Sequence, residues 1–133
     1  MIPRLFVDTG AWYALVDSKD PDHNSAADFI RAGNFPLVTT NFVFDETVTL
    51  IRSRLGLRIA AEFGRKLKDS GFVTLSAINY ADEERAWEIF LKYKDNDFSY
   101  TDCTSFAFME RLRIAAAFSF DSHFRTMRFR VVP

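Results

Sequence analysis

The sequence contains one cysteine, Cys103, and only two histidines among its 133 residues. A single cysteine excludes a disulfide within the chain and is typical of a protein that works in a reducing compartment. So few sulfur and imidazole ligands also argue against a zinc site built from them. No apolar run approaches the roughly 20 residues that a helix needs to cross a bilayer, and the N-terminus lacks the pattern of a secretory signal. We therefore expect a cytoplasmic protein without a membrane segment.

Glycine is also scarce, with five residues, and the glycine-rich motifs of common enzyme classes are missing. There is no G-x-G-x-x-G after a predicted strand and no G-x-x-x-x-G-K-[ST], which excludes the usual dinucleotide and P-loop sites. No serine lies in a G-x-S-x-G turn. Gly10 stands two residues after Asp8, where a haloacid dehalogenase-type phosphatase would carry a second acid.

Apolar residues, by contrast, are abundant, with 48% hydrophobic residues and 15 phenylalanines. This content suffices for one buried core, so residues 1–133 are predicted to form a single domain. The apolar periodicity alternates between strand-like and helix-like segments. Strands are predicted at 4–8, 36–40, 72–76, 114–120 and, at an edge, 129–133, and helices at 10–17, 23–32, 41–55, 57–70, 80–93 and 100–112. The alternation predicts an α/β fold with a mostly parallel, four- or five-stranded sheet flanked by helices.

Two of the predicted strands end on an acid. Asp8 follows "LFV" and Asp121 follows "AFSF". Because the carboxyl ends of parallel strands share one edge of the sheet, where ligands bind, we expect these two side chains to lie close together. A helix cap or a turn explains either acid taken alone. Two acids at the same edge favour a site.

Two helices supply one further acid each. Glu46 falls on the apolar stripe of its helix, between Val43 and Leu50, although an acid at the helix edge that reaches water is the alternative. Asp102 follows Ser99 at the spacing of a capping box, which would explain it structurally. Its helix nevertheless precedes the fourth strand, so Asp102 can face the same cleft.

Four carboxylates in one cleft raise one another's pKa unless cations compensate them. Hard divalent ions with oxygen ligands, such as Mg²⁺ or Mn²⁺, provide that compensation. Such ions polarise a phosphodiester and activate water. The four acids therefore point to metal-dependent phosphodiester hydrolysis.

The stretches "LFVDTGAWYAL", "TTNFVFDETVTL", "DFSYTDCTSF" and "AFSFDSHF", in this order and spacing, resemble the PIN domain, in particular the small VapC-type toxin ribonucleases. The resemblance covers essentially the whole chain. It implies an endoribonuclease whose acids hold one or two Mg²⁺ or Mn²⁺ ions. The matching acids are Asp8, Glu46, Asp102 and Asp121, and the matching small hydroxyl residues are Thr9, Ser99 and Thr101. Asp97 is a candidate for a role outside the direct ligands, with a solvated loop acid as the alternative.

The same resemblance implies the toxin of a type II (VapBC) toxin–antitoxin system, a homodimer, and inhibition by a cognate VapB-like antitoxin. The many aromatic residues leave some for an interface, although an aromatic-rich core is the competing explanation. Asp20 and His23 match positions that are common in the family, and we interpret them as structural. Cys103 stands where the family usually has alanine, and a buried helical thiol there is expected to be inert.

Removing the four proposed ligands leaves 14 acids against 17 bases, a formal charge of +3. Arg125 and Arg128, just beyond Asp121, are the candidates for contacts with RNA phosphates, and a solvated surface is the alternative. The competing function is a PIN-like RNA-binding or regulatory module with little or no catalysis. Four carboxylates at buried positions argue against it, because a scaffold would not need them.

Overall fold

A computed structural model describes residues 3–133 as one parallel five-stranded sheet flanked by helices. The strands lie in the order β3-β2-β1-β4-β5. Their bounds are β1 Leu5–Val7, β2 Leu37–Thr40, β3 Val73–Ser76, β4 Ala116–Phe118 and β5 Arg130–Val132. β1 is central, and its Phe6 pairs with Val38 of β2 and Ala117 of β4. The predicted fold class is confirmed, with five strands and every pairing parallel.

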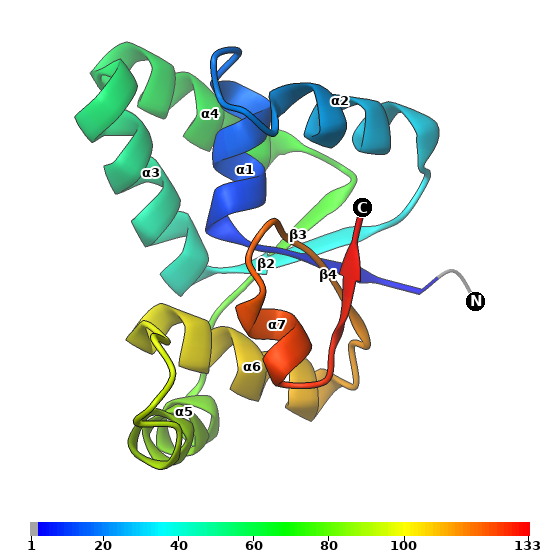
Figure 1. The fold of residues 1–133 in the computed structure, drawn as a ribbon. Coiled ribbons are helices and arrows are strands. Elements are labelled where there is room, and N and C mark those ends of the chain that lie inside the picture. Colours follow the sequence, from blue (N-terminus) through cyan, green and yellow to red (C-terminus); the bar gives the residue numbers. More distant parts are fainter. Residues whose placement is uncertain (1–2) are drawn as a thin grey trace.

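The helices form two layers, one on each face of the sheet (Figure 1). They are α1 Thr9–Val16, α2 His23–Ala32, α3 Asn41–Leu55, α4 Leu57–Asp69, α5 Tyr80–Lys92, α6 Tyr100–Leu112 and α7 His123–Thr126. Right-handed crossovers from β1 to β2 to β3 carry α1–α4 to one face. The crossovers that return to β4 and continue to β5 carry α5–α7 to the other face. None of the described helices is long and apolar enough to span a bilayer.

Two sequence predictions near the C-terminus need correction. The fourth strand was expected over 114–120, but β4 is shorter because Ile114 N–H donates to the Met109 carbonyl at the end of α6. At its other end the chain leaves the sheet where Asp121 N–H donates to the Ser119 hydroxyl. The single-turn helix α7 was not predicted, since four residues are too few to show a helical period.

Local signals explain most of the helix bounds. Asn79 is the N-cap of α5 and Ser99 is the N-cap of α6. Each forms a capping box with the acid three residues later. Thr40 caps α3 by accepting the Val43 N–H. Gly56 separates α3 from α4 at a φ of 95°, a left-handed conformation that favours glycine. The sequence therefore sets the starts of the helices that carry the predicted site acids.

The core is rich in phenylalanine. Five phenylalanine side chains are fully buried, contributed by β1, β4, α6 and α7: Phe6, Phe106, Phe108, Phe118 and Phe124. Phe106 and Phe124 meet edge to face with their ring centroids 5.1 Å apart. An aromatic-rich core thus accounts for much of the phenylalanine content. Other aromatic side chains, on α5 and before β3, remain exposed.

An ion pair between Asp82 of α5 and Arg111 of α6 joins these two helices. The carboxylate is only 2% exposed and accepts from Arg111 Nε at 2.7 Å and from Nη2 at 2.9 Å. Arg111→Met would leave this buried charge without its partner. Because the Arg111 side chain is 38% exposed, water weakens the pair, and we expect a loss of about 2–3 kcal/mol in the free energy of unfolding.

Urea unfolding would measure this loss. Arg31→Met is the matched control, since its ion pair with Asp28 is exposed on both sides and is worth less than about 1 kcal/mol. Equal stability losses in the two variants would contradict a structural role for the Asp82–Arg111 pair.

Candidate active site

The predicted strand-end acids lie where the strand order reverses. The chain leaves β1 toward β2 and leaves β4 toward β5, so a crevice opens between the carboxyl ends of these two neighbouring strands. Asp8 directly follows β1, and its N–H donates to the Phe118 carbonyl at the end of β4, at 3.2 Å. Asp121 follows β4 by three residues. The expected closeness of the two strand ends is confirmed.

Asp102 reaches the crevice from the first turn of α6 while it also closes the capping box. Its N–H donates to the Ser99 hydroxyl, and its Oδ2 accepts the Ser99 N–H, both at 3.0 Å. The structural interpretation of Asp102 is therefore correct, and it coexists with a place in the crevice. The capping box holds the carboxylate in one orientation.

Glu46 enters from α3. The buried stripe of this helix runs through Val43, Thr47 and Ile51, and Glu46 lies half-buried at its border. Asp45 is exposed on the other side. Glu46 therefore faces the crevice from its edge.

These four acids line one cavity of about 550 Å³ at the carboxyl edge of the sheet. Two more acids, Asp20 and Asp22, line it from the loop between α1 and α2. The full lining is Asp8, Thr9, Gly10, Asp20, Asp22, Glu46, Leu50, Asp102, Phe120, Asp121 and Ser122. A cavity of about 610 Å³ between α1, α4 and β3 has one acid in its lining, Glu62, which pairs with Lys66. Of these two cavities, only the acidic one brings several carboxylates together.

Sequence reasoning missed part of this lining. Asp20 was interpreted as structural, and its Oδ1 does accept the Asp22 N–H at 2.9 Å, so it orders the loop and also faces the cavity. Asp22 was not identified. The signal was the "DPD" stretch, which is also a common turn sequence. His23 does not line this cavity, and its Nδ1 lies 2.7 Å from the Ala14 carbonyl.

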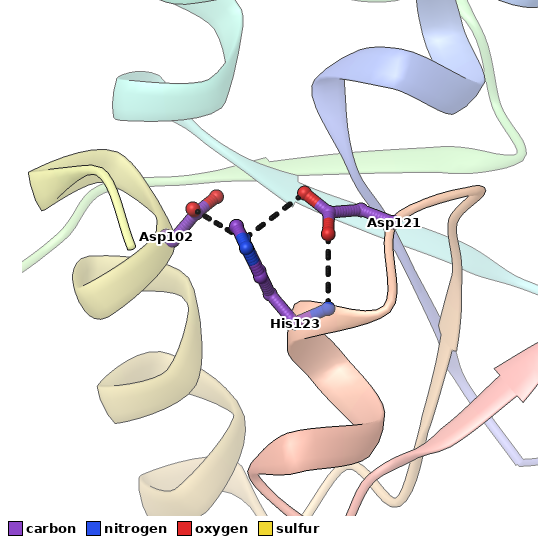
Figure 2. A group of neighbouring side chains, drawn as sticks. All are labelled: Asp102, Asp121 and His123. Carbon is purple, nitrogen blue, oxygen red and sulfur yellow. Dashed lines mark hydrogen bonds and ion pairs between the residues drawn. The ribbon is translucent and has the colours of Figure 1, made fainter. Parts of the chain in front are cut away.

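Ser119 and His123, which were not predicted, connect the acids. The buried Ser119 hydroxyl donates to Asp8 Oδ2 at 3.2 Å and accepts the Asp121 N–H at 3.0 Å. Figure 2 shows the His123 ring between Asp102 and Asp121, with Nδ1 3.2 Å from one Oδ2 of each. One ligand atom from each of these three residues lies within 4.8 Å of the others. Ser119 and His123 each lie two residues from Asp121 in "FSFDSHF". This closeness in the sequence was the signal that could have identified them.

Burial and mutual repulsion make ionisation of the acids unfavourable. Burial raises the pKa of Asp8 to about 7, and the neighbouring charge of Asp102 adds to the rise. Burial also raises the pKa of Asp102, and repulsion by Asp121 acts in the same direction, while the Ser99 N–H and His123 partly offset both. A cation in the cavity would relieve this cost.

The residues present fit a divalent metal. The carboxylates supply hard oxygen ligands, and the buried Thr9 hydroxyl, which also lines the cavity, has no hydrogen-bond partner within the described chain. A buried hydroxyl without a partner beside carboxylates can be satisfied by a polar group or ion bound in the cavity.

The remaining candidate residues lie around the cavity at different depths. Ser99 is the N-cap of α6, and Thr101 is half-buried in its first turn. Asp97 is exposed in the preceding loop and does not line the cavity formed by the described residues. Arg125 and Arg128 are exposed on and just after α7. Cys103 is fully buried, and burial raises the pKa of its thiol to about 11, in agreement with an inert role.

Comparison with known proteins finds a matching family model and relatives of similar sequence. The sequence model of the PIN domain matches residues 5–130. The chain is 34% identical over 125 residues to the 23S rRNA-specific endonuclease VapC20 of Mycobacterium tuberculosis, covering 94% of this chain and 95% of the relative. It is 27% identical over 136 residues to the ribonuclease VapC26 of the same species, covering 97% and 100%.

Solved structures agree with these relatives. The crystal structure of M. tuberculosis VapC20, described as a toxin that cleaves the sarcin–ricin loop, superposes with a TM-score of 0.90 at 32% identity, covering 97% of this chain and 99% of that one. FitAcB from Neisseria gonorrhoeae superposes with a TM-score of 0.71 at 10% identity, covering 97% and 96%, and supports the fold alone.

Proposed function

The chain belongs to the PIN domain family, and on this premise we propose that it is a metal-dependent endoribonuclease, the toxin of a type II (VapBC) toxin–antitoxin system. The observation that carries the proposal is the meeting of Asp8, Glu46, Asp102 and Asp121 in one cavity at the point where the strand order reverses. Ionised acids held together in this way destabilise the folded chain, and a binding module without catalysis would not need them.

Each of the four acids would hold Mg²⁺ or Mn²⁺. Such an ion, when bound, polarises the scissile phosphodiester and lowers the pKa of a coordinated water. The chain orients the ligands beforehand. Ser119 holds Asp8 by a hydrogen bond, and the Ser99 backbone holds Asp102. Thr9 and Thr101 offer hydroxyl groups beside these acids, and we assign Asp97 a supporting role in the loop before α6.

RNA is the proposed substrate. Arg125 and Arg128 lie exposed just beyond Asp121, and we assign their guanidinium groups to contacts with RNA phosphates. Because the relative VapC20 is named for cleavage of 23S rRNA, ribosomal RNA is the first substrate to test. We place the activity in the cytoplasm, where this RNA is found.

Incubation of the purified protein with total RNA tests the proposal. Cleavage should require added Mg²⁺ or Mn²⁺ and stop with excess chelator, and sequencing of the new ends locates the cut. Metal binding and RNA binding without any cleavage would instead favour the regulatory module.

We also propose a VapB-like antitoxin as the inhibitory partner. A cluster of acids invites a basic side chain, and an arginine can pair with Asp8 or Asp102 through two hydrogen bonds. Such an arginine would compete with the metal, so inhibition should weaken as the Mn²⁺ concentration rises.

A homodimer is the proposed assembly, and exposed apolar side chains of α5 support it. Tyr80, Trp87, Phe90 and Leu91 are 75%, 53%, 40% and 58% exposed. Trp87 and Phe90 stack with their ring centroids 5.7 Å apart. Exposed aromatic clusters of this kind are typical of protein interfaces.

Trp87→Glu should weaken dimerisation at least about thirtyfold, because buried tryptophan anchors commonly contribute 2 kcal/mol or more. Sedimentation velocity at micromolar concentration would measure the shift to monomer. Phe72→Glu is the matched control, since Phe72 is 73% exposed but lies before β3, away from α5. A monomeric wild-type protein, or an unaltered dimer in the Trp87 variant, would contradict this assembly.

A further inference from the structure

The imidazole of His123 lies among the acids in a position that a hydrogen-bond donor and a metal ligand could both occupy. Its Nδ1 is 3.2 Å from Asp102 Oδ2 and 3.2 Å from Asp121 Oδ2 (Figure 2). Around an ion with ligand bonds of about 2.1 Å in octahedral geometry, neighbouring ligand atoms lie about 3 Å apart. The two nitrogen–oxygen separations match the edges of such a polyhedron.

Two contacts hold the His123 ring in place, a hydrogen bond from its own backbone and packing against Phe98. His123 begins α7, and its backbone N–H donates to Asp121 Oδ1 at 2.9 Å. Phe98 packs against the ring edge to face, with the centroids 5.0 Å apart and an angle of 74°. The side chain is 24% exposed, so the ring is not sealed inside the core. His123 does not itself line the acidic cavity of the described residues, but its Nδ1 is held against Asp102 and Asp121, which do.

The acids that line the cavity have two chemically different sets of neighbours. Toward Asp8 and Glu46 the candidate ligands are carboxylate oxygens, the set that Mg²⁺ prefers. Toward Asp121 the set gains an imidazole nitrogen, and Asp102 belongs to both sets. Nitrogen ligands favour first-row transition ions, with affinity that rises from Mn²⁺ to Co²⁺ and Ni²⁺.

We propose that His123 is a metal ligand and that, with Asp102 and Asp121, it forms a mixed nitrogen–oxygen site that prefers first-row transition ions to Mg²⁺. This inference rests on the proposed metal-dependent function and adds to it a ligand and a metal selectivity. In the metal-bound protein, Nδ1 binds the ion and the opposite ring nitrogen, Nε2, carries the proton.

His123→Gln tests the proposal through metal binding alone. Calorimetry with Co²⁺ and with Mg²⁺ should show Co²⁺ affinity reduced at least about tenfold and Mg²⁺ affinity changed less than about threefold. In the Co²⁺-loaded wild-type protein, proton NMR should show a hyperfine-shifted, solvent-exchangeable signal from Nε2–H. This signal should be missing in the variant.

His23→Gln is the matched control, because it changes the other histidine of the chain, which lies against the Ala14 carbonyl. Its Co²⁺ and Mg²⁺ affinities and the NMR signal should match the wild type. Circular dichroism on both variants confirms that they fold.

A role for His123 as a hydrogen-bond donor only predicts a different result. If His123 only donates hydrogen bonds to the two carboxylates, it competes with the ion, and His123→Gln would leave both affinities unchanged or raise them together. That result, or a wild-type Co²⁺ protein without the exchangeable signal, overturns the proposal. A wild-type protein that still binds Mg²⁺ and cleaves RNA would leave the proposed function intact, whereas failure to bind any divalent ion would remove both.

Discussion

Asp8→Asn is expected to reduce metal-dependent RNA cleavage about a thousandfold or more, because the loss of metal stabilisation removes several kcal/mol from the transition state. Asparagine keeps the shape of the side chain and can still accept the Ser119 hydrogen bond. It lacks the negative charge that a divalent ion needs. Metal affinity and cleavage rate should therefore fall together, as measured by calorimetry and by single-turnover cleavage of an RNA oligonucleotide.

Asp45→Asn is the matched control for this loss of charge. Asp45 is exposed and adjacent in sequence to Glu46, but it does not line the acidic cavity of the described chain. Its substitution should leave both affinity and rate within about twofold, as is usual for surface changes away from a site. Full activity in the Asp8 variant, or wild-type activity in excess chelator, would refute the mechanism.

The metal-free protein is expected to lose stability between about pH 4 and pH 7, and Asp8 is the main cause. Its pKa is about 7 in the folded chain, compared with an ordinary value of 3.8. A group whose pKa is raised by folding contributes stability that is complete below its unfolded pKa and is lost as the pH rises through the folded value. Asp102 shifts in the same direction. The ionised acids therefore destabilise the empty site above neutral pH.

Asp8→Asn removes the ionisable group and should stabilise the metal-free protein at pH 8. The difference between the folded and ordinary pKa of Asp8 corresponds to a gain of at most about 4 kcal/mol in the free energy of unfolding of the variant. This gain should shrink toward zero as the pH approaches 4. Urea unfolding in chelator at pH 5 and pH 8 would measure the difference. A variant less stable than the wild type at pH 8 would mean that Asp8 is a structural acid.

Added Mn²⁺ should narrow the stability difference between the Asp8 variant and the wild type. Binding to the folded state alone stabilises the wild type by mass action, by about 2.7 kcal/mol when the ion is at 100 times its dissociation constant. The Asp8 variant, which binds weakly, should gain little.

Much of the fold could be predicted from the sequence, because its signals are local. The capping boxes at Asn79 and Ser99 and the glycine at position 56 act within one helical turn, and the observed helices begin close to the expected residues. The apolar runs that end at Asp8 and near Asp121 identified two of the strands. Parallel pairing then brought their ends together, as expected. Helix α7 was missed because a single turn is too short for a periodic pattern.

The composition of the acidic cavity depended on tertiary structure. Asp20 and Asp22 face it only because the loop between α1 and α2 folds over the crevice. Ser119 accepts from the Asp121 N–H and donates to Asp8, which lies 111 residues before it in the sequence. His123, at the start of α7, meets Asp102 in the first turn of α6, although the two residues lie 21 positions apart in the sequence.

The sequence by itself determined the number and order of the strands, the starts of helices α1 to α6 and the places of the four acids along the chain, since short-range hydrogen bonding and apolar periodicity specify them. Only the tertiary structure decided which further side chains join those acids. Their positions depend on loop conformations and on contacts between residues far apart in the chain, and neither leaves a periodic pattern in the sequence.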